Sequence, residues 1–241
     1  MWYPIKGLVR NRILKSFYCA RLAVRLWLAL AASLAAEAAL GGFTIDTQDR
    51  EAVRNFYNAV YDHRAHVRAD WTGSVAACLP GATSREYRDA VQTRINFYRA
   101  MAGVPAQVTF DDQYSLAAQA AALIMSSNDE ISHTPVPGWL CFSLLGAEGA
   151  DNSNLALGSS GMDAIDAYVM DAGPNFRAGH RRWLIYPKTQ VMGTGDIDPA
   201  DGSEEQKANS LWIFDDHFLD PRPATREPFV AWPPPGYVPH T

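Results

Sequence analysis

Residues 84–103 carry a clear helical pattern. Ser84 is a typical N-cap residue, Gly103 lies where the pattern stops, and apolar residues recur between them every three or four positions. The apolar face consists of Tyr87, Val91, Ile95 and Tyr98. The segment therefore predicts an amphipathic helix with one buried side.

Two more helices are predicted at residues 111–129 and 162–173. Asp111 or Asp112 caps the first of them, and its many alanines favour close packing against a sheet. The second stops at Gly173, which a proline follows. Between these two helices, residues 130–161 read as one long loop, and loops of this length in compact domains usually carry function.

Residues 46–70 show a further helical pattern that ends with His63 and His66. Two histidines three positions apart could both bind a metal, but no third ligand is close in sequence. We therefore interpret them as a solvated helix end.

Residues 189–198 alternate like a strand, and residues 209–216 read as a second strand that could pair with the first across an acidic loop. Helices followed by strands, without an internal repeat, predict an α+β domain. The segment 219–241 is dense in proline and cannot form a helix or a central strand. It reads as a strap across the domain, a linker, or a polyproline ligand for a partner.

Residues 1–38 combine basic residues with a later Ala/Leu-rich run and small residues, the order of a secretory signal peptide. A short membrane anchor is the alternative, but the apolar run is short for a span. We expect a secreted, periplasmic or extracellular protein that has no stable membrane span after cleavage.

The charge of the chain is unevenly distributed. The first 38 residues hold six basic residues and one acid, which leaves 15 of the 21 basic and 25 of the 26 acidic residues for the rest. A body with a net charge near −10 is a poor nucleic-acid binder and lacks a polybasic membrane patch. Export also makes a disulfide between Cys78 and Cys141 the natural expectation, with two buried thiols as the alternative.

The residues most able to do chemistry are His133, Asp171 and His180, with Glu148, Ser153 and Asn154 near them in sequence. Imidazole and carboxylate together can bind a divalent metal or move protons near neutral pH. A Gly-Pro turn after Asp171 could fold His180 back beside it. GxSxG, HExxH, P-loop and CxxC patterns are absent from the sequence.

Several motifs, in order from about residue 85 to 216, resemble the CAP superfamily of cysteine-rich secretory, venom-antigen and pathogenesis-related proteins. The matching pieces are Arg94, Asn96 and Arg99, the Ala-rich Leu116–Ala120, His133, "SNLALG" at 153–158, "AIDAYVMD" at 164–171, and "GHRRWLIYPKTQVMGTG" at 179–195. The resemblance implies an α-β-α sandwich with a small antiparallel sheet between helices. On this basis residues 39–84 are an N-terminal extension and 85–218 the CAP domain.

The resemblance also implies a cleft lined by two histidines and two acids, which in some members binds zinc or another divalent ion. The matching histidines are His133 and His180, and Asp171 matches the second acid. The first acid position falls on Ser153, and a serine hydroxyl is a poor metal ligand. Glu148, Asp151 or a water could substitute for it. Asn154 matches a family asparagine that would brace the loop.

In the same reading, Gly179 bends the backbone so that His180 faces the cleft. The apolar residues that follow, Trp183, Leu184 and Ile185, enter the core.

Two functions follow as hypotheses. The first is a secreted, monomeric binding module for a small apolar ligand or a cell-surface partner. The second is a metal-assisted hydrolase that uses His133, His180 and Asp171. The absence of an obvious nucleophile and the serine at position 153 favour the binding module.

Overall fold

The structure is a computed structural model that describes residues 42–173, 177–200 and 203–239. The expected signal segment, 1–38, lies outside the described residues. Residues 42–241 form one compact unit. Within the described part of the chain, no helix is both long enough and apolar enough to cross a membrane.

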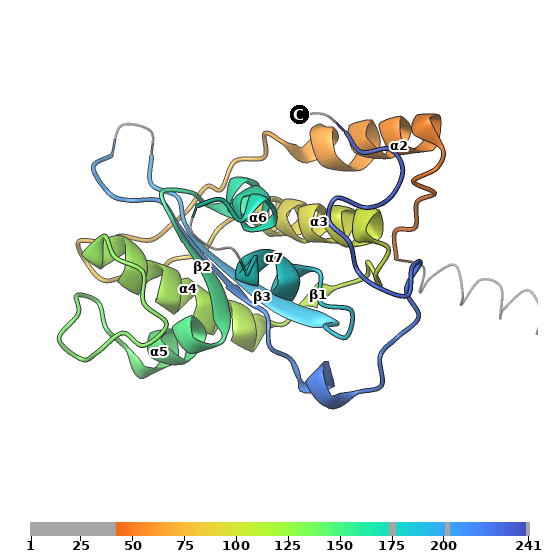
Figure 1. The fold of residues 1–241 in the computed structure, drawn as a ribbon. Coiled ribbons are helices and arrows are strands. Elements are labelled where there is room, and N and C mark those ends of the chain that lie inside the picture. Colours follow the sequence, from red (N-terminus) through yellow and green to blue (C-terminus); the bar gives the residue numbers. More distant parts are fainter. Residues whose placement is uncertain (1–41, 174–176, 201–202, 240–241) are drawn as a thin grey trace, which may run out of the picture. The chain divides into compact units, whose positions relative to one another are not determined.

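The unit alternates helices and short strands (Figure 1). In chain order the elements are α2 (Arg50–Phe56), a π-helical turn (Tyr57–Tyr61), a 3-10 turn (Asp62–Arg64), α3 (Arg85–Ala102), β1 (Thr109–Phe110), α4 (Asp112–Asn128), α5 (Leu144–Asp151), β2 (Ser153–Leu157), α6 (Gly161–Met170), α7 (Gly179–Leu184), β3 (Val191–Ile197), β4 (Ala208–Trp212) and a 3-10 turn (Asp216–Leu219).

The strands form one sheet in the order β1-β3-β4-β2. β4 pairs antiparallel with both β3 and β2, with Leu211 opposite Thr194 on one side and Asn154 on the other. β1 runs parallel to β3, so the sheet is mixed rather than fully antiparallel. Parallel strands need a long connection between them. Here the connection consists of α4, α5, β2, α6 and α7, which all lie between β1 and β3 in the chain. The α+β fold class is confirmed.

Each face of the sheet carries its own apolar core, because neighbouring strand residues point to opposite sides. Ala156 of β2 belongs to the core shared with α3 and α6, whereas Leu155 belongs to the core shared with α4 and α5. Figure 1 shows α3 and α6 on one side of the strands and α4 and α5 on the other. The result is an α-β-α sandwich.

The two strongest helix predictions are confirmed with their caps. The Ser84 hydroxyl accepts the Tyr87 N–H at 3.2 Å, and Gly103 ends α3 in the left-handed conformation at φ 73°. Asp111 caps α4 by accepting the N–H groups of Gln113 and Tyr114. The helix predicted over 46–70 is shorter, and the loop predicted over 130–161 is wrong in its second half, which contains α5 and β2.

Two tertiary links hold segments outside the helices and strands. Cys78 and Cys141 form the expected disulfide, with an S–S distance of 2.08 Å, so the prediction is confirmed. It joins the loop before α3 to the loop after α4. At the other end of α3, Arg226 donates to the carbonyls of Ala100 and Met101, and the Trp232 ring meets the Tyr98 ring at 5.4 Å. The proline-rich segment thus packs along α3.

Candidate functional site

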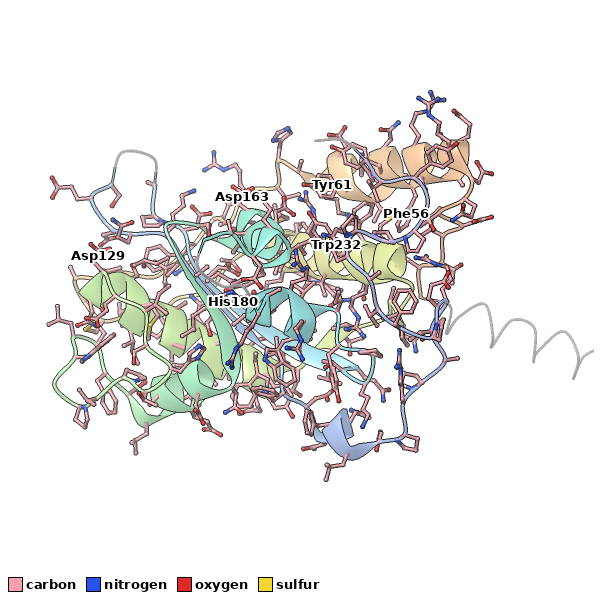
Figure 2. The ribbon with its side chains drawn as sticks, in the orientation of Figure 1. Phe56, Tyr61, Asp129, Asp163, His180 and Trp232 are labelled. Atoms are coloured by element: carbon pink, nitrogen blue, oxygen red, sulfur yellow. A yellow bond between two sulfur atoms is a disulfide. The ribbon has the colours of Figure 1, made fainter. Side chains whose placement is uncertain are left out.

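α7 presents His180 at the surface, and the end of this helix is anchored in the core. The residue with positive φ at the start of this helix is Ala178, at φ 48°, rather than Gly179, where the sequence suggested the bend. At the other end of α7, Leu184 is fully buried and Ile185 is 6 % exposed, so the apolar run does enter the core. Figure 2 labels His180 on this helix.

Asp171 and His180 form a hydrogen-bonded pair. Asp171 ends α6 in the left-handed conformation, and its Oδ1 lies 2.9 Å from His180 Nδ1. Its Oδ2 accepts the backbone N–H of Arg181 at 3.2 Å. The Asp171 side chain is 1 % exposed, whereas the His180 side chain is 36 % exposed. A buried carboxylate therefore orients a partly exposed imidazole.

Asn154 and Tyr168 hold His180 in position. The Asn154 side-chain amide donates to the His180 carbonyl at 3.0 Å, and the Asn154 carbonyl lies 3.0 Å from the Tyr168 hydroxyl. The Tyr168 ring lies 5.4 Å from the His180 ring. Burial raises the pKa of Tyr168 well above its ordinary value, so its hydroxyl stays protonated and donates. β2 and α6 thus fix the position of α7.

His133 lies in the loop after α4. It is exposed, and its Nδ1 lies 2.8 Å from the Ala150 carbonyl near the end of α5. Ala150 comes just before β2, whose Asn154 holds His180. Both histidines are therefore anchored to residues 150–154, the first through α5 and the second through β2.

Ser153 occupies a different environment from its neighbour Asn154. Both residues are 3 % exposed, but successive strand residues face opposite sides of the sheet, so Ser153 faces α4 and α5. Among the described residues, its Oγ is one of two buried side-chain polar atoms without a hydrogen-bond partner. Glu148 and Asp151, the possible substitutes, are exposed on α5.

The donor set falls short of a complete zinc site. Zinc sites in proteins use at least three side-chain ligands, and the described part of the chain contains no group of three His, Cys, Asp or Glu that could hold a metal ion. Both oxygens of Asp171 already accept hydrogen bonds, from His180 and from Arg181. Asp171 orients His180 here rather than standing as an independent ligand.

An aromatic cavity of about 260 Å³ lies next to the Asp171–His180 pair. Its walls come from the π-helical turn, α3, the end of α6, α7 and the proline-rich segment. They include Tyr61, Phe97, Tyr98, Met170, Arg181 and Trp232. Met170 precedes Asp171 and Arg181 follows His180, so the cavity and the pair share one edge. Sequence reasoning missed this cavity, since its aromatic residues come from three segments far apart in the chain.

One wall of the cavity is held by a polar cluster around Asp166. Tyr61 and Tyr98 donate their hydroxyls to this carboxylate at 2.8 and 2.9 Å, and Arg94 donates at 2.5 Å. Burial, followed by the hydrogen bond to Asp166, raises the pKa of Tyr61 to about 12. The cluster fixes the rings in place, so the cavity is preformed.

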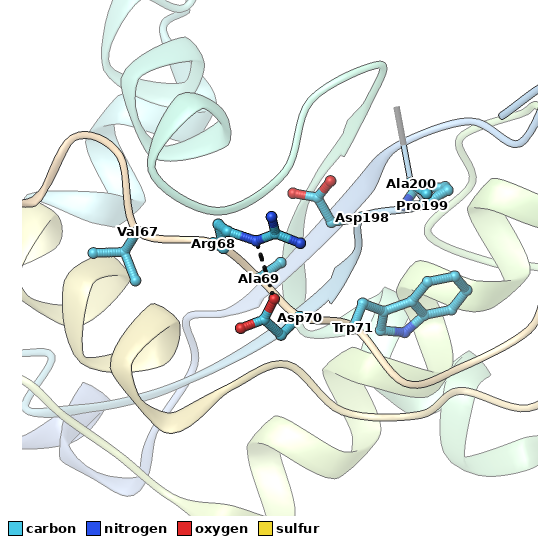
Figure 3. A pocket seen from close by; sticks show the side chains of 8 residues that line it. All are labelled: Val67, Arg68, Ala69, Asp70, Trp71, Asp198, Pro199 and Ala200. Carbon is cyan, nitrogen blue, oxygen red and sulfur yellow. Dashed lines mark hydrogen bonds and ion pairs between the residues drawn. The ribbon is translucent and has the colours of Figure 1, made fainter. Parts of the chain in front are cut away.

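A more polar hollow of about 380 Å³ lies between residues 67–71 and 198–200 (Figure 3). Arg68 pairs with Asp70 at 3.2 Å, and Asp198 pairs with Lys207 at 3.0 Å. Since these charges are already paired within the protein, we assign this hollow no ligand.

Parts of the chain are similar to known proteins. The family model described as "CAP: Cysteine-rich secretory protein family" matches residues 92–214, just over half of the chain. Among solved structures, an outer surface protein from Borrelia burgdorferi is similar, with 17 % identity and a TM-score of 0.35. That match covers 54 % of this chain and 95 % of the other. No curated protein sequence shows significant similarity.

Proposed function

Because the chain belongs to the CAP family, the Cysteine-rich secretory protein family, we propose that it binds a small apolar ligand in the aromatic cavity beside His180. Membership of this family indicates an extracellular binding or signalling module. The finer assignment, a small apolar ligand, is supported by the preformed cavity.

The cavity fits such a ligand in shape and chemistry. Ligand pockets are mostly apolar, with a few polar groups that fix orientation. Here aromatic rings supply the apolar walls, and Arg181 and the tyrosine hydroxyls supply polar groups at the edge. Arg181 also donates to the Val169 carbonyl at 2.9 Å, which holds its guanidinium at the cavity. A ligand with an apolar body and one polar group matches this arrangement.

Calorimetric titration with indole and 2-naphthol tests the proposal. Met170 is 70 % exposed at the cavity edge, so Met170→Asp places a short charged side chain there without disturbing the core. We expect saturable binding to residues 42–241, weakened about tenfold by Met170→Asp, since an apolar ligand seated in the cavity would strip water from the carboxylate at its edge.

Leu219→Asp is the matched control, because Leu219 is 89 % exposed and does not line the cavity. Equal loss of binding in both variants, or no saturable binding of either compound to the wild type, would contradict the proposal.

A metal-assisted hydrolase is the second candidate, and one observation favours it. His133 and His180 each engage Nδ1 with an acceptor, the Ala150 carbonyl and the Asp171 carboxylate. Metal-binding histidines show this pattern, in which the other ring nitrogen meets the metal. His133 and His180 would supply two ligands, fewer than the three side chains that catalytic zinc sites use, and the ion would supply Lewis acidity.

Zinc titration by calorimetry separates the two candidates. Saturable binding that His133→Ala and His180→Ala both abolish, and that His63→Ala leaves intact, would support the second function. His63 is the control because it is exposed on the turn after α2. Absence of binding would leave the apolar-ligand function alone.

A further inference from the structure

Residues 228–239, the strap, form one wall of the aromatic cavity. The strap residues that line the cavity are Trp232, Pro233, Val238 and Pro239. Pro235 and Tyr237 lie between them in the chain, are exposed, and are not among the residues that line the cavity. The strap therefore has one side on the cavity and the other side in solvent.

The other walls of the cavity are held by contacts between helices. The hydroxyl of Tyr61 in the π-helical turn donates to Asp166 of α6 at 2.8 Å, and the Tyr61 carbonyl accepts from Arg94 of α3 at 3.3 Å. α7 is tied to α3 through Arg99, which donates to the Leu184 carbonyl at 3.0 Å. The strap contains no helix or strand over its described length. It is therefore the wall with the least support from secondary structure.

Within the described part of the chain, Thr47 alone fastens the strap by hydrogen bonds. Its hydroxyl donates to the Pro235 carbonyl at 2.8 Å, and its carbonyl accepts the Tyr237 N–H at 2.7 Å. Gly236 lies between these two contacts at φ 101°, and a Cβ there would lie 2.2 Å from the Thr47 carbonyl oxygen. The close approach of the strap to Thr47 therefore requires glycine at position 236.

Arg226, just before the strap, makes a stronger attachment. Its backbone N–H donates to the Gly103 carbonyl at 2.8 Å, and its guanidinium donates to the carbonyls of Met101 and Ala100 at 2.7 and 3.3 Å. These carbonyls lie at the end of α3, where a helix has no acceptor partners of its own. Hydrogen bonds from a charged donor are stronger than neutral ones. Opening therefore begins at Thr47, and Arg226 remains as the hinge.

We propose that the strap is a lid, which detaches from Thr47, turns about Arg226 and admits the ligand to the aromatic cavity. This inference rests on the proposed function, because it concerns the same cavity. A segment with few hydrogen bonds to its domain opens locally, without unfolding of the domain. Opening removes the Trp232 ring from the cavity wall, whereas the polar cluster around Asp166 stays in place. Lids of this kind control the rate of ligand exchange.

Gly236→Ala is the variant that releases the strap, since the added Cβ cannot fit against the Thr47 carbonyl. Gly158→Ala is the matched control, because Gly158 also has a positive φ, 81°, but a Cβ there would meet no described atom within 4 Å. Thr47→Val is a second variant, which keeps the shape of the side chain and removes the hydrogen bond to Pro235. Near-ultraviolet circular dichroism checks that each variant is folded.

Hydrogen exchange at the Tyr237 amide, followed by NMR on residues 42–241 without ligand, tests the opening itself. In the wild type we expect this amide to exchange faster than the core amides of α3. Gly236→Ala should speed the exchange about tenfold and Thr47→Val less, whereas Gly158→Ala should leave it unchanged. The lid is overturned if Tyr237 exchanges no faster than the core of α3, or equally fast in the Gly236 and Gly158 variants.

Stopped-flow binding of 2-naphthol tests whether the opening controls access to the cavity. Gly236→Ala destabilises the closed strap with and without ligand, so the association and dissociation rate constants should both rise about tenfold, with nearly the same Kd. A rise in the dissociation rate constant alone would make the strap a fixed wall and overturn the proposal. Absence of binding to the wild type would overturn the proposed function and with it the ligand of the lid, and the exchange measurement shows separately whether the strap opens.

Discussion

Asp171 is the residue on which the position of His180 depends. Its backbone adopts the left-handed conformation at φ 48°, and its carboxylate accepts from both His180 Nδ1 and the Arg181 N–H. Aspartate and asparagine tolerate this backbone conformation better than most residues. Asp171 therefore ends α6, and its buried carboxylate holds the first turn of α7 through His180 and Arg181.

Asp171→Ala is expected to lower the free energy of unfolding by about 2 kcal/mol, since it leaves the Arg181 N–H and His180 without their acceptor. Asp171→Asn retains an acceptor oxygen and tolerates the same φ, so its loss should be smaller. Urea denaturation of both variants measures the difference. Equal losses would mean that the acceptor at this position contributes little.

Asp196 is a second buried carboxylate, with no exposed surface. It accepts the Gly161 N–H at 2.6 Å and the Asn209 amide at 2.8 Å, and the Thr194 hydroxyl lies 3.0 Å from its Oδ2. Burial raises its pKa above the ordinary value of 3.8, against the opposing effect of these hydrogen bonds. The folded state therefore holds a proton on Asp196 more tightly than the unfolded state does.

This shift predicts a pH dependence of stability. The contribution of Asp196 is fully present below pH 3.8 and is lost as the pH rises through the raised folded value. The unfolding free energy of the wild type should therefore fall, relative to Asp196→Asn, as the pH rises above about 4. Urea midpoints of both proteins at several pH values measure this difference. A pH-independent difference between them would contradict the shift.

Single residues also show what the sequence could predict of the site. The contact between His180 and Asp171 could be predicted because the Gly-Pro pair between them in the sequence is a local turn signal. The burial of Ser153 is not local, because it depends on which face of β2 meets α4. The aromatic cavity is even harder to predict from neighbouring residues in the sequence, since Trp232 and Tyr98 are far apart in the chain and meet only in the folded domain.

At the scale of elements, glycine explains why the sequence predicts a loop where α5 forms. A Cβ on Gly146 would lie 2.5 Å from Ile124 Cδ1, and a Cβ on Gly149 would lie 2.2 Å from the Ala117 carbonyl oxygen. These glycines allow α5 to approach α4 closely. In sequence they resemble turn residues, so a pattern that marks tight packing also resembles irregular structure. The caps of α3 and α4 were predictable because capping is local.

Arg99 joins three elements through one buried side chain. It has no exposed surface, and its guanidinium donates to the carbonyls of Pro105, Leu184, Tyr186 and Thr189. Burial lowers its pKa to about 9, so it remains charged at neutral pH. The end of α3 is thereby tied to the end of α7 and to the start of β3.

Arg99→Lys is expected to cost about 3 kcal/mol or more, because a single ammonium cannot reach the carbonyls that the guanidinium spans. Arg85→Lys is the control, since the Arg85 side chain is 83 % exposed. Thermal unfolding measures the loss, and hydrogen exchange should show earlier opening of α7 in the Arg99 variant. A loss no larger than that of the control would show that the four carbonyls find other donors.

At the scale of the whole molecule, the disulfide restrains a large part of the chain. Cys78 and Cys141 are 63 residues apart, and the closed loop includes all of α3 and α4. A cross-link over a loop of this length removes about 4 kcal/mol of chain entropy from the unfolded state.

The double variant Cys78→Ser with Cys141→Ser is expected to be less stable than the oxidised wild type by about this amount. Urea denaturation with and without dithiothreitol provides the check, since reductant should lower the wild type to the level of the variant. A wild type that reductant leaves unchanged would contradict the expected role of the bridge.

The proline-rich segment has one more consequence, which concerns the two ends of the unit. The Thr47 hydroxyl donates to the Pro235 carbonyl at 2.8 Å, and the Tyr237 N–H donates to the Thr47 carbonyl at 2.7 Å. The first and last described segments therefore lie side by side. A short peptide joining them would close the chain into a ring, so the unit is suited to circular permutation and to insertion within a surface loop of another protein.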